Sequence, residues 1–351
     1  MSKTRLHGIS AALAAAALFG AGAPLAKLLL DQTSPWLLAG LLYAGSGLGL
    51  LLWRLLRRAP AVHLAPVERC WLALAILFGG VLGPVLLMLG LARMPASGAS
   101  LLLNAEAVLT ALVAWVVFKE NAGRRVVLGM ASIVTGGLVL AGFGHAGFGG
   151  MAPILMVLAA CLTWAIDNNL TRKIALADAS FIAMAKGLVA GFVNLALAMW
   201  TGATWPGPGP LLGAGALGLL AYGVSLVLFI VALRELGAAR TGAYFSVAPF
   251  FGAALAVVVL REAVTPELLV AGLLMAVGVW LHVTEHHGHF HTHEVIEHSH
   301  AHTHDDHHQH PHDETTAEHP VPGLRHTHAH RHESLPHVHA HWPDAHHRHS
   351  H

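Results

Sequence analysis

The chain has 351 residues, of which 55% are hydrophobic and only 11% are charged, whereas a typical soluble domain has about 25% charged residues. This composition excludes an ordinary soluble globular protein, and the formal net charge of +1 gives no reason to expect a nucleic-acid partner. The two cysteines, Cys70 and Cys161, show no CxxC spacing, so we expect neither a disulfide nor a cysteine metal site. The composition therefore predicts a polytopic membrane protein.

Long apolar segments follow one another from the N-terminus to about residue 285. About 20 apolar residues cross a hydrocarbon core of roughly 30 Å, and ten segments reach about that length. The first continues past Pro24, so we expect an uncleaved span rather than a signal peptide. The sequence predicts an all-α fold of ten transmembrane helices, at about 8–30, 36–53, 68–91, 97–118, 123–141, 151–171, 180–200, 211–233, 239–260 and 264–284.

Basic residues are distributed unevenly among the short connections. Thirteen lie in the N-terminal segment and the connections on the same side, whereas the opposite connections hold only Arg93 and Arg261. Cytoplasmic loops carry an excess of Lys and Arg, so we expect the N-terminus in the cytoplasm. An even number of spans then returns the C-terminal tail to the cytoplasm.

An internal repeat relates the two halves. The segment SLLLNAEAVLTALVAWVVFKE, ending at Glu120, aligns with GAYFSVAPFFGAALAVVVLRE, ending at Glu262, at a shift of 142 residues. Five spans is an odd number, so the second half is inserted upside down relative to the first, and a binding site is expected near the midplane. We therefore predict a first repeat at 1–145, a second at 146–284 and a tail at 285–351.

Both aligned segments end in a small-residue helix followed by Lys-Glu or Arg-Glu, as in AEAVLTALVAWVVFKE from Ala105 and APFFGAALAVVVLRE from Ala248. With ten helices in two repeats, residues 1–284 resemble the EamA-type transporters of the drug/metabolite transporter superfamily. The resemblance implies an inner-membrane carrier that moves a small polar metabolite, such as an amino acid, by alternating access, with export favoured. Ala107 stands where the family often has the proline seen here as Pro249, so we carry no helix kink over to that position.

A few polar and charged residues fall within the expected spans. A charge at the centre of a membrane helix costs roughly 2.5–3.5 kcal/mol on insertion scales, so such residues face protein or a water-filled path. Trp164 lies deep in the sixth span and could face the same path. The candidate substrate-binding residues are Lys27, Asn104, Glu106, Trp164, Asp167, Asn168, Asn169 and Lys186.

Each candidate has a structural alternative. Lys27 could extend to the membrane interface, and Glu106 could be satisfied by a neighbouring helix. Asp167 and Lys186 lie near the cytoplasmic side of an antiparallel helix pair and could meet, either as a structural ion pair or in transport. We hypothesise that Glu106, Asp167 and Lys186 line the cavity and that one carboxylate titrates.

From His282, at the end of the tenth span, through the tail, the chain holds 26 of its 29 histidines, in H-x-H runs mixed with Asp and Glu. Imidazole and carboxylate groups suit Zn²⁺, Ni²⁺, Co²⁺ or Cu²⁺, and the few apolar residues predict disorder without metal. A metal buffer or sensor, a cytoplasmic pH sensor and no selected role all stay open. The expected metal ligands are His286, His287, His289, His291, His293, His298, His300, His302 and His304.

Two further readings remain beside the metabolite transporter. One is a divalent-metal transporter (Zn, Ni or Co) fed or regulated by the tail, although no span carries metal-binding side chains at i, i+4 spacing. The other is a metal- or pH-responsive membrane sensor. We expect no enzyme, no required cofactor and no nucleic-acid partner. The expected partners are the lipid bilayer, a small-molecule substrate and divalent metal at the tail, and a homodimer is left open.

Overall fold

The structure is a computed structural model. It describes residues 3–62, 64–118, 124–143, 150–174, 178–236, 241 and 244–284, together with four tail segments, 288–292, 296–302, 326–332 and 336–340. The chain divides into a helical membrane unit, Met1–Glu285, and a tail unit, His286–His351.

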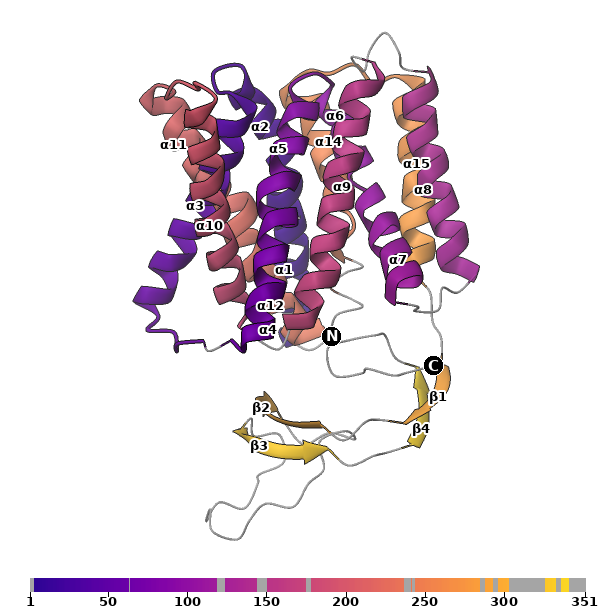
Figure 1. The fold of residues 1–351 in the computed structure, drawn as a ribbon. Coiled ribbons are helices and arrows are strands. Elements are labelled where there is room, and N and C mark those ends of the chain that lie inside the picture. The colour runs from indigo at the N-terminus through magenta and orange to yellow at the C-terminus, as the bar shows by residue number, and fades with distance from the viewer. Residues whose placement is uncertain are drawn as a thin grey trace. The chain divides into compact units, whose positions relative to one another are not determined.

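Long helices that run the height of the membrane unit form a single bundle (Figure 1). Without water in the bilayer core, a helix is the form in which one segment satisfies its own backbone hydrogen bonds. The elements are α1 (Lys3–Gly20), α2 (Gly22–Leu30), α3 (Pro35–Leu56), α4 (Pro66–Ala75), η1 (Ile76–Leu82), α5 (Gly83–Leu91), α6 (Ala96–Leu102), α7 (Ala105–Phe118), α8 (Arg124–Phe143), α9 (Met151–Thr171), η2 (Arg172–Ile174), α10 (Ala179–Trp200), α11 (Pro208–Leu217), η3 (Gly218–Val224), α12 (Ser225–Leu236), α14 (Ala248–Val259) and α15 (Pro266–Val283).

The predicted spans are confirmed. Among the described residues, eight helical segments are long and apolar enough to cross a membrane, and they match the first eight predicted spans. The ninth and tenth correspond to the shorter apolar helices Ala248–Val259 and Pro266–Leu281. Several spans begin at a polar cap followed by proline. For example, Ser34 and Thr265 accept backbone hydrogen bonds from the first turns of α3 and α15.

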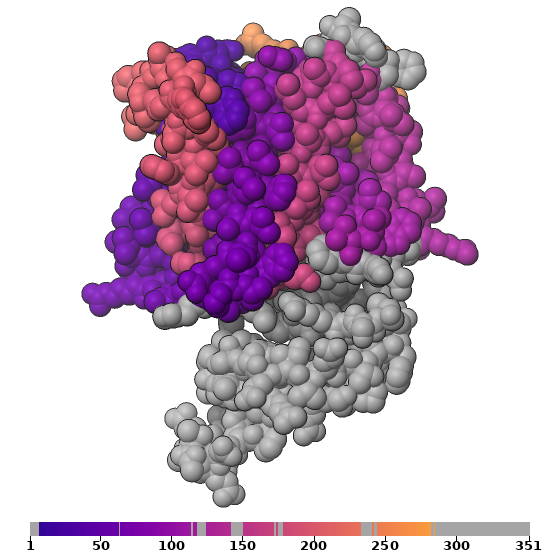
Figure 2. Space-filling model, viewed as in Figure 1, coloured from indigo at the N-terminus to yellow at the C-terminus, as the bar shows by residue number. Residues whose placement is uncertain are grey.

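Helices of the first half pack mainly against helices of the second half. Helix α3 lies along α10, α8 along α15, α6 against α14, α1 against α12, and α5 against α9. The third span (α4, η1 and α5) contacts both α9 and α10, and Figure 2 shows it filling the face between them. The two halves are therefore interleaved rather than set side by side.

The closest approach between the halves lies where α3 crosses α10. A Cβ atom at Gly187 would come within 2.7 Å of Gly47 Cα, and a Cβ at Gly47 would overlap the backbone of Leu188. Small residues at a membrane helix interface allow such contact between backbones. This crossing needs glycine on both sides.

Breaks near the middle interrupt at least the first and the fourth of the described spans. The first breaks at Ala21, between α1 and α2, and the fourth breaks at Leu103 and Asn104, between α6 and α7. No proline causes the break in the fourth span. It lies three residues before Ala107, the position where the family often has a proline and where we expected no kink. At the break the backbone changes to i→i−3 hydrogen bonds, as from Glu106 N to Leu103 O, and Asn104 Nδ2 bonds back to Leu101 O.

Among the described residues, two spans contain a wider, π-helical turn. In the third span this turn is η1, and in the eighth span it is η3; each has seven residues. Ile76 and Gly218, which begin them, lie 142 positions apart. This is the shift that aligns the two halves in sequence, so the wide turn belongs to the repeated unit. Turns of this kind are rare and often occur at functional sites.

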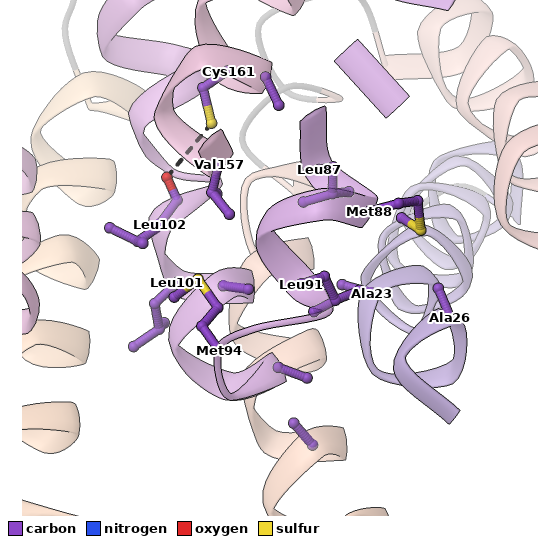
Figure 3. Close-up of a cluster of buried hydrophobic side chains, with 14 of the residues drawn as sticks. Ala23, Ala26, Leu87, Met88, Leu91, Met94, Leu101, Leu102, Val157 and Cys161 are labelled. Atoms are coloured by element: carbon purple, nitrogen blue, oxygen red, sulfur yellow. Dashed lines mark hydrogen bonds between the residues drawn. The ribbon is translucent and has the colours of Figure 1, made fainter. Parts of the chain in front are cut away.

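The main apolar core extends through the bundle, and one part of it lies between the first, third, fourth and sixth spans. Figure 3 shows Leu87, Met88 and Leu91 of α5 near Ala23 and Ala26 of α2, with Val157 and Cys161 of α9 near α6. Cys161 is fully buried, and its Sγ lies 3.7 Å from the carbonyl oxygen of Leu102. The core thus packs α6 against α9 immediately before the break in the fourth span.

The described tail segments are four short strands, which form two antiparallel pairs. Strand β1 (Gly288–Thr292) pairs with β4 (Pro336–Ala340), and β2 (Ile296–His302) pairs with β3 (His326–His332). Alternating H-x-H runs have the period of two that a strand requires, and their x positions include residues that favour strands, such as Thr292 and Val338.

Candidate functional site

An ion pair joins α9 to α10 inside the membrane unit. Lys186 Nζ lies 2.7 Å from Oδ1 and 2.6 Å from Oδ2 of Asp167, and Thr171 Oγ1 donates a 2.9 Å hydrogen bond to Oδ1. The side chain of Asp167 is 7% exposed and that of Lys186 is 18% exposed. The structure therefore brings together the two residues that the antiparallel helix pair predicted, with both carboxylate oxygens of Asp167 bonded.

The π-helical turn η1 shapes the surroundings of this pair. A Cβ atom at Gly79 would overlap the carboxylate of Asp167, so only glycine allows the turn to approach so closely. The carbonyl oxygen of Gly79 accepts hydrogen bonds from Tyr43 Oη at 2.8 Å and Trp164 Nε1 at 3.0 Å. Asn194 Nδ2 donates to the next carbonyl, that of Gly80, at 3.1 Å. The wide turn thus presents its carbonyl groups to side chains of three other spans.

A second carboxylate, Glu106, lies in the first turn of α7, just after the break in the fourth span. Its Oε1 accepts a 2.8 Å hydrogen bond from Asn168 Nδ2, and Asn168 also approaches Thr110 Oγ1 at 3.4 Å. Asp167 and Lys186 lie close enough to act electrostatically on Glu106. Within the described part of the chain, no Lys, Arg or His forms an ion pair with Glu106.

These four residues, Glu106, Asp167, Asn168 and Lys186, are named here the intramembrane polar group. They come from the fourth, sixth and seventh spans. Asn168 is exposed and Glu106 is partly exposed, whereas Asp167 is buried. The group therefore combines a closed ion pair with an accessible carboxylate–amide pair.

The other predicted site residues make different contacts. Lys27 Nζ donates to carbonyl oxygens at the end of α5, and Asn104 Nδ2 contacts Leu101 O and Met275 Sδ. Trp164 bonds to the η1 backbone, and Asn169 bonds to backbone carbonyls of its own helix and of α7. The structure does not bring Lys27 or Asn104 into the polar group, and it uses Asn169 to join α9 to α7.

Sequence reasoning missed several contributors to this region. Thr110 follows Glu106 by four residues, on the same face of α7, so helical spacing could have identified it. Thr171 stands in the same relation to Asp167. Tyr43 and Gly79 had no such signal, because their roles depend on how the second and third spans pack against the sixth.

The predicted metal ligands all lie in the tail. His286, His287, His293 and His304 lie outside the described residues, and His289, His291, His298, His300 and His302 lie on strands β1 and β2. In the part of the chain that the structure describes, no three His, Cys, Asp or Glu side chains lie together as a metal site would require. The intramembrane polar group has two carboxylates, but its third charged member is a lysine, whose positive charge disfavours a metal cation there.

The sequence and the fold of this chain are similar to those of known proteins. The sequence model of the EamA-like transporter family matches residues 6–142 and again residues 151–284. The chain belongs to the EamA-like transporter family. It is a multi-pass membrane transporter, and the double match gives one family unit for each five-helix half.

One relative of this EamA-like transporter is an "Uncharacterized transporter" of Methanothermobacter thermautotrophicus. It is 28% identical over 303 residues, covering 79% of this chain and 86% of the relative. A solved structure, titled only "Crystal structure of protein", superposes with a TM-score of 0.59 at 21% identity. It covers 80% of this EamA-like transporter and 96% of the solved chain, and it supports the fold alone.

Proposed function

We propose that this EamA-like transporter carries a small polar metabolite that bears a protonated amine, such as an amino acid, through the intramembrane polar group. The observation that carries this proposal is the Glu106 carboxylate, which lies within a span and, among the described residues, accepts side-chain hydrogen bonds from the amide of Asn168 alone. A carboxylate offers about four acceptor positions, and Asn168 occupies one of them. An ammonium group is the natural partner for the others.

The charge of the polar group supports a cationic ligand. Asp167 and Lys186 neutralise each other, so an ionised Glu106 leaves the group with one net negative charge. An isolated charge within a membrane span is costly, and a bound ammonium would remove that cost. Asn168 donates one hydrogen bond to Oε1 of Glu106 and is uncharged, so it does not neutralise this carboxylate.

The same proposal includes transport by alternating access and a cytoplasmic location of both termini. Inverted five-helix repeats with interrupted helices near the midplane are typical of carriers that expose one central site to each side in turn. The excess of Lys and Arg on the side of the N-terminus supports a cytoplasmic location of both termini in an inner membrane. Export from the cytoplasm is the direction we favour.

Flux into proteoliposomes tests the substrate class. Wild-type protein should transport at least one amino acid or related amine, and Glu106→Gln should reduce that flux by tenfold or more, because an amide cannot form a charge-assisted bond with an ammonium. Glu68→Gln is the matched control, since Glu68 accepts a hydrogen bond from Ala65 N at the start of α4 and glutamine also accepts one. Equal flux for wild type and Glu106→Gln would refute the proposal, and no flux for any substrate would favour the membrane sensor.

A divalent-metal transporter is the second candidate, and the histidine-rich tail is the observation that favours it. We propose instead that the tail is a separable metal-binding segment. Thermal stability of the full chain and of a form truncated after Glu285 distinguishes the two, because a ligand of the native state raises apparent stability. Loss of every metal effect on truncation, with a metabolite still stabilising both forms, supports our proposal. Stabilisation of the truncated form by metals alone would support metal transport.

A further inference from the structure

Lys27, in α2, holds the end of α5. Its Nζ donates hydrogen bonds to the carbonyl oxygens of Leu91 at 2.5 Å and Met94 at 3.1 Å. The last carbonyl groups of a helix have no partner within that helix, and a cation at the C-terminus also interacts favourably with the helix dipole. A residue of the first span thus caps the third span.

Glu262, which follows α14, holds the start of α6 in a complementary way. Its Oε1 accepts from Ala96 N at 2.7 Å, and its Oε2 accepts from Ser97 N at 2.8 Å. The N-cap residue of α6 is Pro95, whose side chain makes no capping hydrogen bond. The first N–H groups of a helix need a partner, and here a residue between the ninth and tenth spans supplies it.

The backbone before Glu262 has an uncommon conformation. Arg261 has a φ of 55°, in the left-handed region that non-glycine residues rarely adopt. This residue turns the chain after α14 so that the next carboxylate meets the start of α6. Strained backbone of this kind persists where the surrounding contacts enforce it, and it is frequent at switch regions.

The turn at residues 92–95, which joins α5 to α6, is therefore held from two sides by residues of other spans. Together, Lys27, Glu262 and this turn are named the end clamp. The end clamp lies where α2, α5 and α14 finish and α6 begins, at the top of Figure 1. Lys27 and Glu262 also attract each other electrostatically. Two hydrogen bonds donated by Lys27 tie α2 to the end of α5 within the first half, and the two accepted by Glu262 tie the first half to the second at this end.

We propose that Lys27 and Glu262 are gating residues, and that the end clamp closes this end of the transport path and releases it in the opposite state. Helix α6 runs from the end clamp directly to the break at Leu103 and Asn104, beyond which lies Glu106. Loss of both caps would free α6 to move away from α9 and expose the polar group toward this end. This gating proposal does not depend on the proposed substrate class, because the end clamp would act in the same way for any transported substrate.

The chain contains a native reporter for this movement. Cys161 lies on α9, is fully buried and contacts the last residue of α6, Leu102 (Figure 3). The other of the two cysteines in the sequence, Cys70, is exposed. Cys70→Ser therefore leaves a single thiol, which becomes reactive when α6 separates from α9.

The test measures how fast a maleimide reagent labels Cys161 in purified full-length protein that carries Cys70→Ser. We expect slow labelling of this parent and labelling about tenfold faster or more with Glu262→Ala or Lys27→Met, because each removes two charge-assisted hydrogen bonds from the closed state. Glu262→Gln keeps one acceptor oxygen and should give an intermediate rate. Glu267→Ala is the matched control, since Glu267 lies at the same end, in the first turn of α15.

General loss of stability must be separated from gating. Ile182→Ala removes a buried side chain from a separate apolar cluster, and it serves as a control of lowered thermal stability. The gating proposal is wrong if folded Glu262→Ala and Lys27→Met are labelled at Cys161 at the parent rate. It is also wrong if they are labelled no faster than Ile182→Ala when the melting temperatures of the variants have fallen equally. The labelling rates of Glu262→Ala and Lys27→Met are measured without any substrate, so failure of the gate and failure of the proposed substrate site give different results.

Discussion

Arg54 and Asp178 join the second span to the seventh at the end of the bundle opposite the end clamp. Their side chains are 3.1 Å apart, and Arg54 is only 8% exposed. Asp178 is also the N-cap of α10 and accepts backbone hydrogen bonds from Ser180 and Phe181. Partial burial alone would raise the pKa of Asp178, but the hydrogen bonds from Ser180 and Phe181 and the nearby guanidinium hold that pKa below its usual value.

This relationship predicts a pH dependence of stability. A carboxyl group whose pKa is lower in the folded protein stabilises it at pH values above the unfolded pKa of about 4, and the contribution is lost as the pH falls through the folded pKa. Asp178→Asn should therefore melt at a lower temperature than wild type at pH 7. The difference should shrink as the pH falls below about 4, and a difference independent of pH would contradict this account.

The ion pair of Asp167 and Lys186 predicts an asymmetry between single and double substitutions. Lys186→Met leaves a buried carboxylate without its cation and should lower the free energy of unfolding by about 3–5 kcal/mol. The double variant Asp167→Asn/Lys186→Met removes both charges and should be more stable than Lys186→Met alone. Thermal melting of wild type and of these two variants in detergent provides the measurement. Equal stability of the single and double variants would show that the pair is not coupled.

The crossing of α3 and α10 predicts an effect of a single methyl group. Gly187→Ala places a Cβ within 2.7 Å of Gly47 Cα and should destabilise the protein by about 1–3 kcal/mol through overpacking. Gly215→Ala is the control, because a Cβ there meets nothing within 4 Å and alanine favours a helix. Melting temperatures should fall for the first variant and stay level or rise for the second. The opposite order would disprove the close approach.

The predicted orientation can be tested with the native thiol Cys70, which lies early in α4 and is exposed. A maleimide that does not cross membranes should leave Cys70 unlabelled in intact cells and should label it after permeabilisation. Labelling after permeabilisation shows that the thiol is reactive and serves as the internal control. Rapid labelling in intact cells would place this end of the bundle outside and reverse the proposed orientation.

The sequence predicted those features that the bilayer itself dictates. Span length and apolar composition follow from membrane thickness, so the helices were located within a few residues. Asp167 and Lys186 were paired correctly because adjacent antiparallel helices bring residues on facing turns together. Glu106 and Asn104 were correctly given different partners, because a separation of two residues points side chains to different faces of a helix.

What sequence reasoning missed depends on contacts between the two halves. Lys27 was expected at the substrate, but its partners are backbone carbonyls, which leave no trace in side-chain patterns. Glu262 was noted only as part of the repeated ending of each half, although it caps a helix more than 160 residues away. The overlap that a side chain at Gly79 would make with Asp167 arises only after the wide turn of η1 has formed.

The wide turns η1 and η3 bear on the origin of the chain. A π turn takes in one more residue than an α turn, so each half carries the equivalent of a one-residue insertion at the same aligned position. A single insertion before gene duplication explains both turns, whereas two later insertions would have to coincide in position and effect. The extra residue is therefore older than the ten-helix chain, and it already belonged to the five-helix ancestor from which the two halves descend.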